Sequence, residues 1–183
     1  MIQITPTERD AILREDFPSF LQASFHALEP NKTFEANWHH KAICSLLVES
    51  QGKQTHAFIS APPRSLKSFI VSVAWVAFKL GHDPTHKFIC ASYSRDLANN
   101  LARQCRTLMQ TDFYQRVFTT RLDKATEDEL TTTQNGYRLS VSVGSTLTGL
   151  GGDTLIVDDP LNASDAYSET LRRNGNTWFT DTL

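Results

Sequence analysis

The run FIVSVAWVAF, residues 69–78, constrains the fold of this chain most strongly, because a helix built from it is apolar nearly all round. Such a helix has to be buried, and packing against a sheet is the usual way to bury it. Gly81 follows shortly and predicts its end. Ten residues are about half of what a membrane span needs. The run therefore predicts a buried helix in a layered core.

Strand and helix patterns lie on both sides of this run. THAFIS, residues 55–60, is a short strand candidate before it, and HKFICASYS, residues 86–94, predicts a buried strand after it. Residues 95–109 then repeat apolar side chains at helical spacing. The order strand, loop, helix, strand, helix is typical of α/β proteins with a mostly parallel sheet.

Towards the N-terminus, apolar residues recur at three- to four-residue spacing. Residues 1–30 predict a helix interrupted by Pro18, and residues 38–49 predict a second helix. We expect a helical segment over residues 1–52, followed by one α/β domain over residues 53–183. A total of 183 residues is enough for one domain with a sizeable core.

The second half of the chain contains turn signals between short apolar stretches. Residues 111–128 predict a helix end and a loop. Asn135-Gly136 between two β-prone runs predicts a hairpin. A glycine-rich turn then leads into DTLIVDDP, residues 153–160, which predicts a strand ending in carboxylates, and the SDAYSETLRR stretch starting at Ser164 predicts a capped helix.

Composition favours an ordinary globular protein of the cytosol. The net charge of −2 provides no general attraction to nucleic acid or anionic lipid, so any DNA contact has to be local or lie outside this chain. The N-terminus lacks the order of a signal peptide. Cys44, Cys90 and Cys105 are an odd number in apolar surroundings, which favours core positions; a redox or metal role is the alternative.

The stretch SAPPRSLKS, residues 60–68, has the order of a phosphate-binding loop. Lys67 and Ser68 stand at the predicted start of the buried helix, where a lysine neutralises phosphate charge and a hydroxyl reaches Mg²⁺. Ala61 and Leu66 occupy the two places where such loops usually have glycine. Leu66 is strained by about 1–2 kcal/mol if its backbone is left-handed. An ordinary strand-to-helix connection is the alternative.

Asp158 and Asp159 follow the apolar strand LIV, as nucleotide hydrolases require for Mg²⁺ and for the attacking water. A turn after the strand is the simpler alternative, since Asp-Pro readily begins one. A paired-carboxylate metal nuclease is a further reading. His39 and His40 suggest a metal site, but consecutive helical residues do not face one ligand, so a helix start is favoured.

Four stretches, in this order, resemble the large terminase subunits of tailed bacteriophages and prophages, the motors that package viral DNA. They are NWHHKAICSLL, APPRSLKS, CASYSRDLANNLARQCR and LTGLGGDTLIVDDP, and the resemblance covers about residues 34–183. It implies the additional-strand, RecA-like P-loop ATPase fold, with SAPPRSLKS as Walker A and TLIVDDP as Walker B. It also implies ATP and Mg²⁺ as cofactors.

The resemblance also implies roles by position. Lys67 would contact the β- and γ-phosphates, Ser68 would hold Mg²⁺ directly, and Asp158 would hold it through water. Asp159 stands where the catalytic carboxylate stands, and Arg64 matches an arginine that stabilises transition-state charge. The remaining implied nucleotide contacts are the loop residues Pro62, Pro63, Ser65 and Leu66, and Trp38 and His39 near the adenine.

The implied partners are double-stranded DNA, the small terminase subunit and the portal protein of the procapsid, bound in the host cytoplasm by a homo-oligomeric ring without membrane contact. Arg103 with Arg106, and Arg172 with Arg173, are candidate DNA patches, although solvated helix faces explain them as well.

Two positions depart from the family pattern. Leu66 replaces a glycine, and Leu150 stands where relatives commonly carry an arginine finger, which predicts weakened nucleotide binding and hydrolysis. The family continues with a coupling strand and a nuclease domain, so we expect either a segment of the motor or a prophage relic that acts only as a binding or assembly module. Another P-loop enzyme, such as a kinase or helicase, is a third reading.

Overall fold

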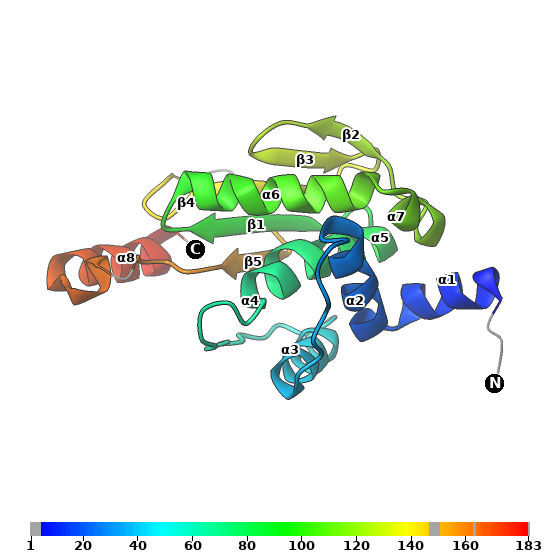
Figure 1. Cartoon of the computed structure of the whole chain (residues 1–183). Coiled ribbons are helices and arrows are strands. Elements are labelled where there is room, and N and C mark those ends of the chain that lie inside the picture. Colours follow the sequence, from blue (N-terminus) through cyan, green and yellow to red (C-terminus); the bar gives the residue numbers. More distant parts are fainter. Residues whose placement is uncertain (1–4, 147–150, 163, 183) are drawn as a thin grey trace.

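The structure of the protein is a computed structural model, which describes residues 5–146, 151–162 and 164–182. Figure 1 shows one layer of strands and a larger group of helices. The helical elements are α1 (Pro6–Glu15), α2 (Phe17–Leu28), α3 (Trp38–Glu49), α4 (Lys67–Phe69), η1 (Ile70–Ala74), α5 (Trp75–His82), α6 (Arg95–Gln110), α7 (Asp112–Val117), η2 (Asp165–Tyr167) and α8 (Glu169–Thr182). The strands are β1 (Lys87–Ser92), β2 (Leu122–Ala125), β3 (Glu129–Thr132), β4 (Tyr137–Ser142) and β5 (Thr154–Val157).

The five strands form a mixed sheet in the order β2-β3-β4-β1-β5. β1 pairs in parallel with β4 and β5, whereas β3 pairs antiparallel with β2 and β4. The expectation of a mostly parallel sheet is therefore wrong for the β2–β4 half. The predicted hairpin is confirmed, with Asn135 at a φ of 66° in its turn, a conformation that asparagine tolerates.

THAFIS is not a strand. Residues 54–62 have no regular secondary structure and are mostly exposed, and Phe58 is 94% exposed. A strand needs a partner edge for its backbone groups, and no strand of the described chain pairs with these residues. β2, in contrast, forms where a loop was expected, because the edge of β3 supplies such a partner.

The buried helix forms as predicted but is not uniform. It runs from Lys67 to His82 as α4, η1 and α5, and η1 is one turn of π-helix. All but one of the η1 side chains are buried. π-helical turns are rare and are frequently found near functional sites. This one begins three residues after Lys67.

The predicted N-terminal helix is two helices joined at Asp16. Thr5 and Glu8 form a capping box at the start of α1. The carboxylate of Asp16 accepts from the amide of Ser19 and so caps α2, with Pro18 in its first turn. Residues 1–4 of the expected helix lie outside the described part.

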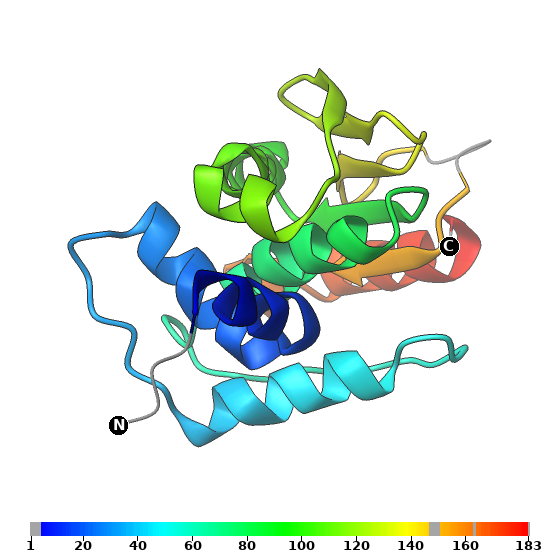
Figure 2. The ribbon, with the colours of Figure 1, turned by 90° about the vertical axis from the view of Figure 1, so that its right-hand side faces the viewer.

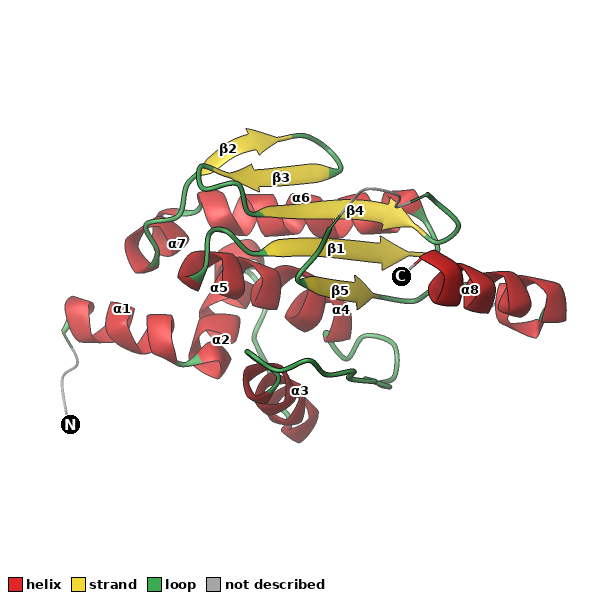
Figure 3. Ribbon diagram, turned by 180° about the vertical axis from the view of Figure 1, so that it is seen from behind, coloured by secondary structure: helices red, strands yellow, loops and turns green. Residues whose placement is uncertain are grey.

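The main core lies between one face of the sheet and the helices α1, α2, α3, α5, α6 and α7. It joins residues from the N-terminal helices, such as Phe17 and Phe20, to residues of the buried helix and the sheet, such as Phe78 and Phe88. Figure 3 looks onto the opposite face of the sheet, where Trp178 of α8 packs in a smaller cluster. All three cysteines are buried and free, as core positions require.

Other helices deviate little from expectation. α6 carries the predicted stripe, and α8 begins at Glu169 after a short 3-10 turn, rather than at Ser164. No helix of the described residues is both long enough and apolar enough to cross a membrane.

Candidate functional site

Lys67 meets both aspartates of LIVDDP at one edge of the sheet. Its Nζ atom lies 2.6 Å from Oδ1 of Asp159 and 3.4 Å from Oδ1 of Asp158. The residues are about 90 positions apart in the sequence. Lys67 and the two carboxylates therefore form one cluster. The sequence alone suggested only that these groups act together.

Strand pairing brings the carboxylates to this place. β5 runs parallel to β1 and ends at Val157, and the amide of Asp158 donates to the carbonyl of Ala91 at 2.9 Å. The amide of Tyr93, just after β1, donates to the carbonyl of Asp159 at 3.0 Å. Both aspartates thus lie at the carboxyl ends of parallel strands, where open α/β sheets bind their ligands.

The two carboxylates have different surroundings. The side chain of Asp158 is 7% exposed, and its Oδ2 atom has no hydrogen-bond partner among the described residues. The side chain of Asp159 is 50% exposed, and its backbone has a φ of 47°. A buried acceptor without a partner is costly, so Asp158 has capacity for one more donor or a cation.

The carboxylates also set the charge of Lys67. Burial acts to lower the pKa of its ammonium group, but the hydrogen bond to Asp159 and the negative charges of both aspartates act more strongly together. The net pKa of Lys67 is raised, and the lysine stays positively charged. The cluster therefore contains a fixed cation beside two anions.

The loop before Lys67 has the backbone shape of an anion-binding turn. Leu66 is left-handed, with φ 61° and ψ 12°, and Lys67 starts the helix. A left-handed residue followed by a helical one directs successive backbone amides to a common point, which favours an anion. Within the described part, the amides of Arg64, Ser65 and Leu66 donate to no protein group. The strain expected at Leu66 is thus present, at about 1–2 kcal/mol.

The other predicted residues lie around this loop with different exposure. Ser65 is buried, Ser68 is half-buried, and Pro62, Pro63 and Arg64 are exposed. Arg64 also has a positive φ, of 63°.

Trp38 and His39 begin α3, beside which the loop segment runs back towards α4 (Figure 2). Trp38 is 77% exposed, while His39 is half-buried with an Nε2 atom that has no partner in the described chain. Leu150 lies outside the described residues. The arginine pairs of α6 and α8 are mostly exposed, and Arg106 and Arg172 donate to nearby carbonyls.

His40 is a residue of the site that sequence reasoning assigned no role there. It is buried in the first turn of α3, and its Nε2 atom lies 3.2 Å from the carbonyl of Ser65 in the loop. Its place next to His39 suggested only a helix start. No periodic pattern reveals a contact between residues 25 positions apart.

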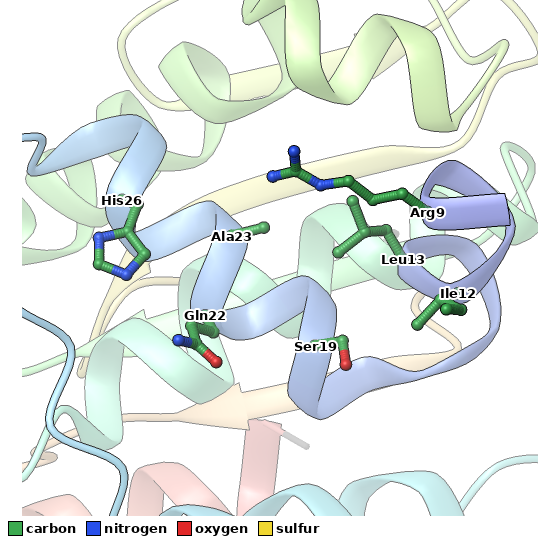
Figure 4. Close-up of a pocket in the computed structure, with 7 residues that line it drawn as sticks. All are labelled: Arg9, Ile12, Leu13, Ser19, Gln22, Ala23 and His26. Atoms are coloured by element: carbon green, nitrogen blue, oxygen red, sulfur yellow. The ribbon is translucent and has the colours of Figure 1, made fainter. Parts of the chain in front are cut away.

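Two cavities of similar volume differ in their relation to the cluster. One of about 370 Å³ is lined by Tyr93, Asp159, Leu161 and Asn162 and so adjoins the carboxylate of Asp159. The other, of about 380 Å³, lies between α1 and α2 (Figure 4) and shares no residue with the site; its lining includes Arg9, Ile12, Leu13, Ser19, Gln22 and His26. The first cavity is the one that the chemistry of the cluster can use.

A comparison with models of protein families and a search of curated proteins found no match to this chain.

Proposed function

We propose that this chain binds Mg-ATP at the loop of residues 60–68 and hydrolyses it, as the ATPase segment of a terminase-like DNA-packaging motor. The observation that carries the proposal is the cluster of Lys67, Asp158 and Asp159 directly after a left-handed loop residue. A cation, converging amides and two carboxylates are the groups that a metal-bound triphosphate requires.

The loop would hold the phosphates. The amides around Leu66 donate to no described protein group, and the helix that starts at Lys67 adds its positive end. Lys67 would exchange its carboxylate partners for the β- and γ-phosphates. Its raised pKa keeps it charged for this role. Arg64, exposed on the same loop, would stabilise the charge that develops on the transferred phosphoryl group.

The surroundings of Asp158 fit a magnesium ion. Its Oδ2 atom is buried and has no partner among the described residues, and a water bound to the metal would donate to it. The Ser68 hydroxyl, at the start of the helix, would bind the ion directly. Mg²⁺ would neutralise phosphate charge and polarise the phosphoryl oxygens.

Asp159 would act on the attacking water. Its carboxylate is half-exposed and borders the cavity of about 370 Å³. Once Lys67 binds phosphate, this carboxylate is free to orient a water and to accept its proton as the water attacks the γ-phosphorus and ADP leaves. Tyr93 holds the backbone of Asp159 in position through its amide.

The motor part of the proposal rests on the order of the four sequence stretches. The α/β sheet with helices is compatible with the RecA-like P-loop fold that this resemblance implies. Double-stranded DNA, the small terminase subunit and the portal protein are then the expected partners, and a ring is the expected assembly. A DNA-stimulated hydrolysis rate would distinguish such a motor from a P-loop kinase.

The test is a titration with Mg-ATP together with a measurement of phosphate release. We expect binding and slow hydrolysis by the wild type, and at least about tenfold weaker binding by Lys67→Ala, because a charge-assisted phosphate contact is lost. Lys53→Ala, on an exposed turn, is the matched control and should behave as the wild type. Equal phosphate release by wild type and Lys67→Ala contradicts the enzyme and leaves the binding or assembly module.

A further inference from the structure

The imidazole of His40 connects the start of α3 to the phosphate loop through two hydrogen bonds. Its Nδ1 atom accepts from the amide of Asn37 at 3.2 Å, and its Nε2 atom lies 3.2 Å from the carbonyl oxygen of Ser65. An amide can only donate and a carbonyl can only accept. The ring is therefore neutral with its proton on Nε2, and that N–H donates to Ser65.

The carbonyl of Ser65 belongs to the same peptide group as the amide of Leu66. A trans peptide is planar, and its C=O and N–H point in opposite directions. A bond from His40 to the carbonyl therefore directs the Leu66 amide away from α3. That amide donates to no protein group in the described chain, and Leu66 is the left-handed residue of the anion-binding turn.

The residues before and after Ser65 both have a strained, left-handed backbone conformation. Arg64 and Leu66, at φ 63° and 61°, stand on either side of Ser65. Non-glycine residues persist in this region only where their surroundings hold them. The Leu66 side chain packs against the main core on one side, and the His40 bond holds the peptide on the other.

The ring of His40 is itself held firmly. It is 7% exposed, and Phe34 packs against it with ring centroids 5.4 Å apart. The capping arrangement with Asn37 fixes the start of the helix that carries it. Both ring nitrogens are bonded to backbone groups, one at the start of α3 and one in the loop before α4.

We propose that His40 is a positioning residue of the phosphate loop, holding the peptide between Ser65 and Leu66 so that its amide faces the bound phosphate. The hydrogen bond from His40 stabilises the left-handed backbone conformation at position 66, which glycine would adopt without strain. This role rests on the proposed nucleotide binding. It explains how leucine can occupy position 66 in a left-handed conformation.

Two substitutions separate the two hydrogen bonds of the ring. His40→Asn retains an acceptor for the Asn37 amide, but its side chain is too short to reach Ser65. His40→Gln places an amide N–H near the position of Nε2 and retains the bond to the loop. We expect His40→Asn to weaken Mg-ATP binding about three- to tenfold, the factor that one hydrogen bond represents, and His40→Gln to stay within about twofold of the wild type.

The decisive experiment introduces His40→Asn into the Leu66→Gly variant as well as into the wild type. With glycine at position 66 the left-handed conformation carries no strain, so the loop needs no support from His40. We expect His40→Asn to change affinity by less than about twofold in this background, a clear departure from additivity. An equal loss with and without Leu66→Gly, or no rescue by His40→Gln, overturns the positioning role while nucleotide binding stands.

A measurement without nucleotide tests the hydrogen bonds themselves. Nitrogen-15 NMR of the imidazole should show a protonated Nε2 and an unprotonated Nδ1, and backbone nitrogen-15 relaxation should show larger motions over residues 64–66 in His40→Asn than in the wild type. A ring with its proton on Nδ1, or unchanged relaxation over these residues, overturns the proposal. Absence of Mg-ATP binding by both wild type and Leu66→Gly overturns the proposed function, and the role of His40 with it.

Discussion

The aromatic cluster beneath α2 and the loop of residues 60–68 are opposite in character. The cluster consists of Phe17, Phe20, Phe78, Tyr114 and Phe118, with ring centroids 5.1–6.3 Å apart and every side chain at most 4% exposed. Its hydroxyl group is satisfied, because Tyr114 donates to the carbonyl of Ala77 at 2.9 Å.

The site region, meaning the loop of residues 60–68 together with Asp158 and Asp159, contains strain and unsatisfied groups. Three of the four non-glycine residues with positive φ in the described chain lie here, namely Arg64, Leu66 and Asp159. Ser65 Oγ and Asp158 Oδ2 are buried without a partner among the described residues. Strained backbone and incomplete polar networks concentrate at functional sites, where the rest of the fold has to stabilise them. The comparison teaches that the aromatic cluster contributes mainly to stability, whereas the site region has the strain and the unsatisfied groups on which the proposed function depends.

The largest stability effect should come from the aromatic cluster. Phe20→Ala removes a fully buried ring and should lower the free energy of unfolding by about 3–5 kcal/mol, from lost transfer energy and the cavity left behind. Denaturant titration measures this change. Phe58→Ala, at an exposed ring, is the matched control and should stay within about 0.5 kcal/mol of wild type. A loss of similar size from both would break the comparison.

In the site, a substitution should affect turnover far more than stability. Asp159→Asn retains the size and the left-handed backbone of the residue, but it removes the proposed base and should slow ATP hydrolysis about 10²–10⁴-fold. The ion pair with Lys67 is half-exposed on its carboxylate side, so the free energy of unfolding should change by less than about 1 kcal/mol.

Asp123→Asn, on the exposed face of β2, is the control and should leave hydrolysis unchanged. Hydrolysis by Asp159→Asn at the wild-type rate would remove this residue from the mechanism, even if Lys67 remains essential.

Two helical glycines test how tightly the core is packed. A Cβ at Gly81 would lie 2.5 Å from ring carbons of Phe118, so Gly81→Ala should destabilise the protein by about 1–3 kcal/mol. At Gly175 the nearest atom, on Leu161, is 3.7 Å away, so Gly175→Ala should stabilise α8 by up to about 1 kcal/mol. Midpoints of thermal unfolding that shift in opposite directions for the two variants confirm the difference. A higher midpoint for Gly81→Ala would show that the core around Phe118 is packed less tightly.

The smallest effect concerns pH. Burial lowers the pKa of His40, helped by the charge of neighbouring His39 and opposed by the bond to Ser65, and burial and Lys79 lower the pKa of His86. Below the ordinary pKa of 6.5, the unfolded chain takes up protons at these residues before the folded protein does. Stability should therefore fall as the pH drops through this value.

Unfolding midpoints at pH 7.5 and pH 5.5 measure this slope, and His40→Asn should reduce it. An identical slope in the variant would mean that His40 does not contribute to the pH dependence of stability. The acid sensitivity would then arise elsewhere, for example at His86.

Several elements follow from local sequence alone. The stripe of Leu101, Cys105 and Leu108 predicted α6, and Asn135-Gly136 predicted the hairpin of β3 and β4, because spacing and turn chemistry act over a few residues. The wrong predictions concern strands, whose formation depends on a neighbouring strand to pair with. THAFIS has strand-like composition but no paired edge, and β2 is charged yet pairs with β3. Pairing between distant segments is not encoded in a short window.

The candidate site divides in the same way. The sequence by itself determined which groups are available: a lysine and a serine at a helix start, two carboxylates after a strand, and a leucine where glycine is usual. Only the tertiary structure decided that Lys67 contacts both carboxylates, that Leu66 is left-handed, and that His40 bonds to the loop. The physical reason is that parallel strand pairing and helix packing bring together residues 25 to 92 positions apart, and no local pattern specifies such contacts.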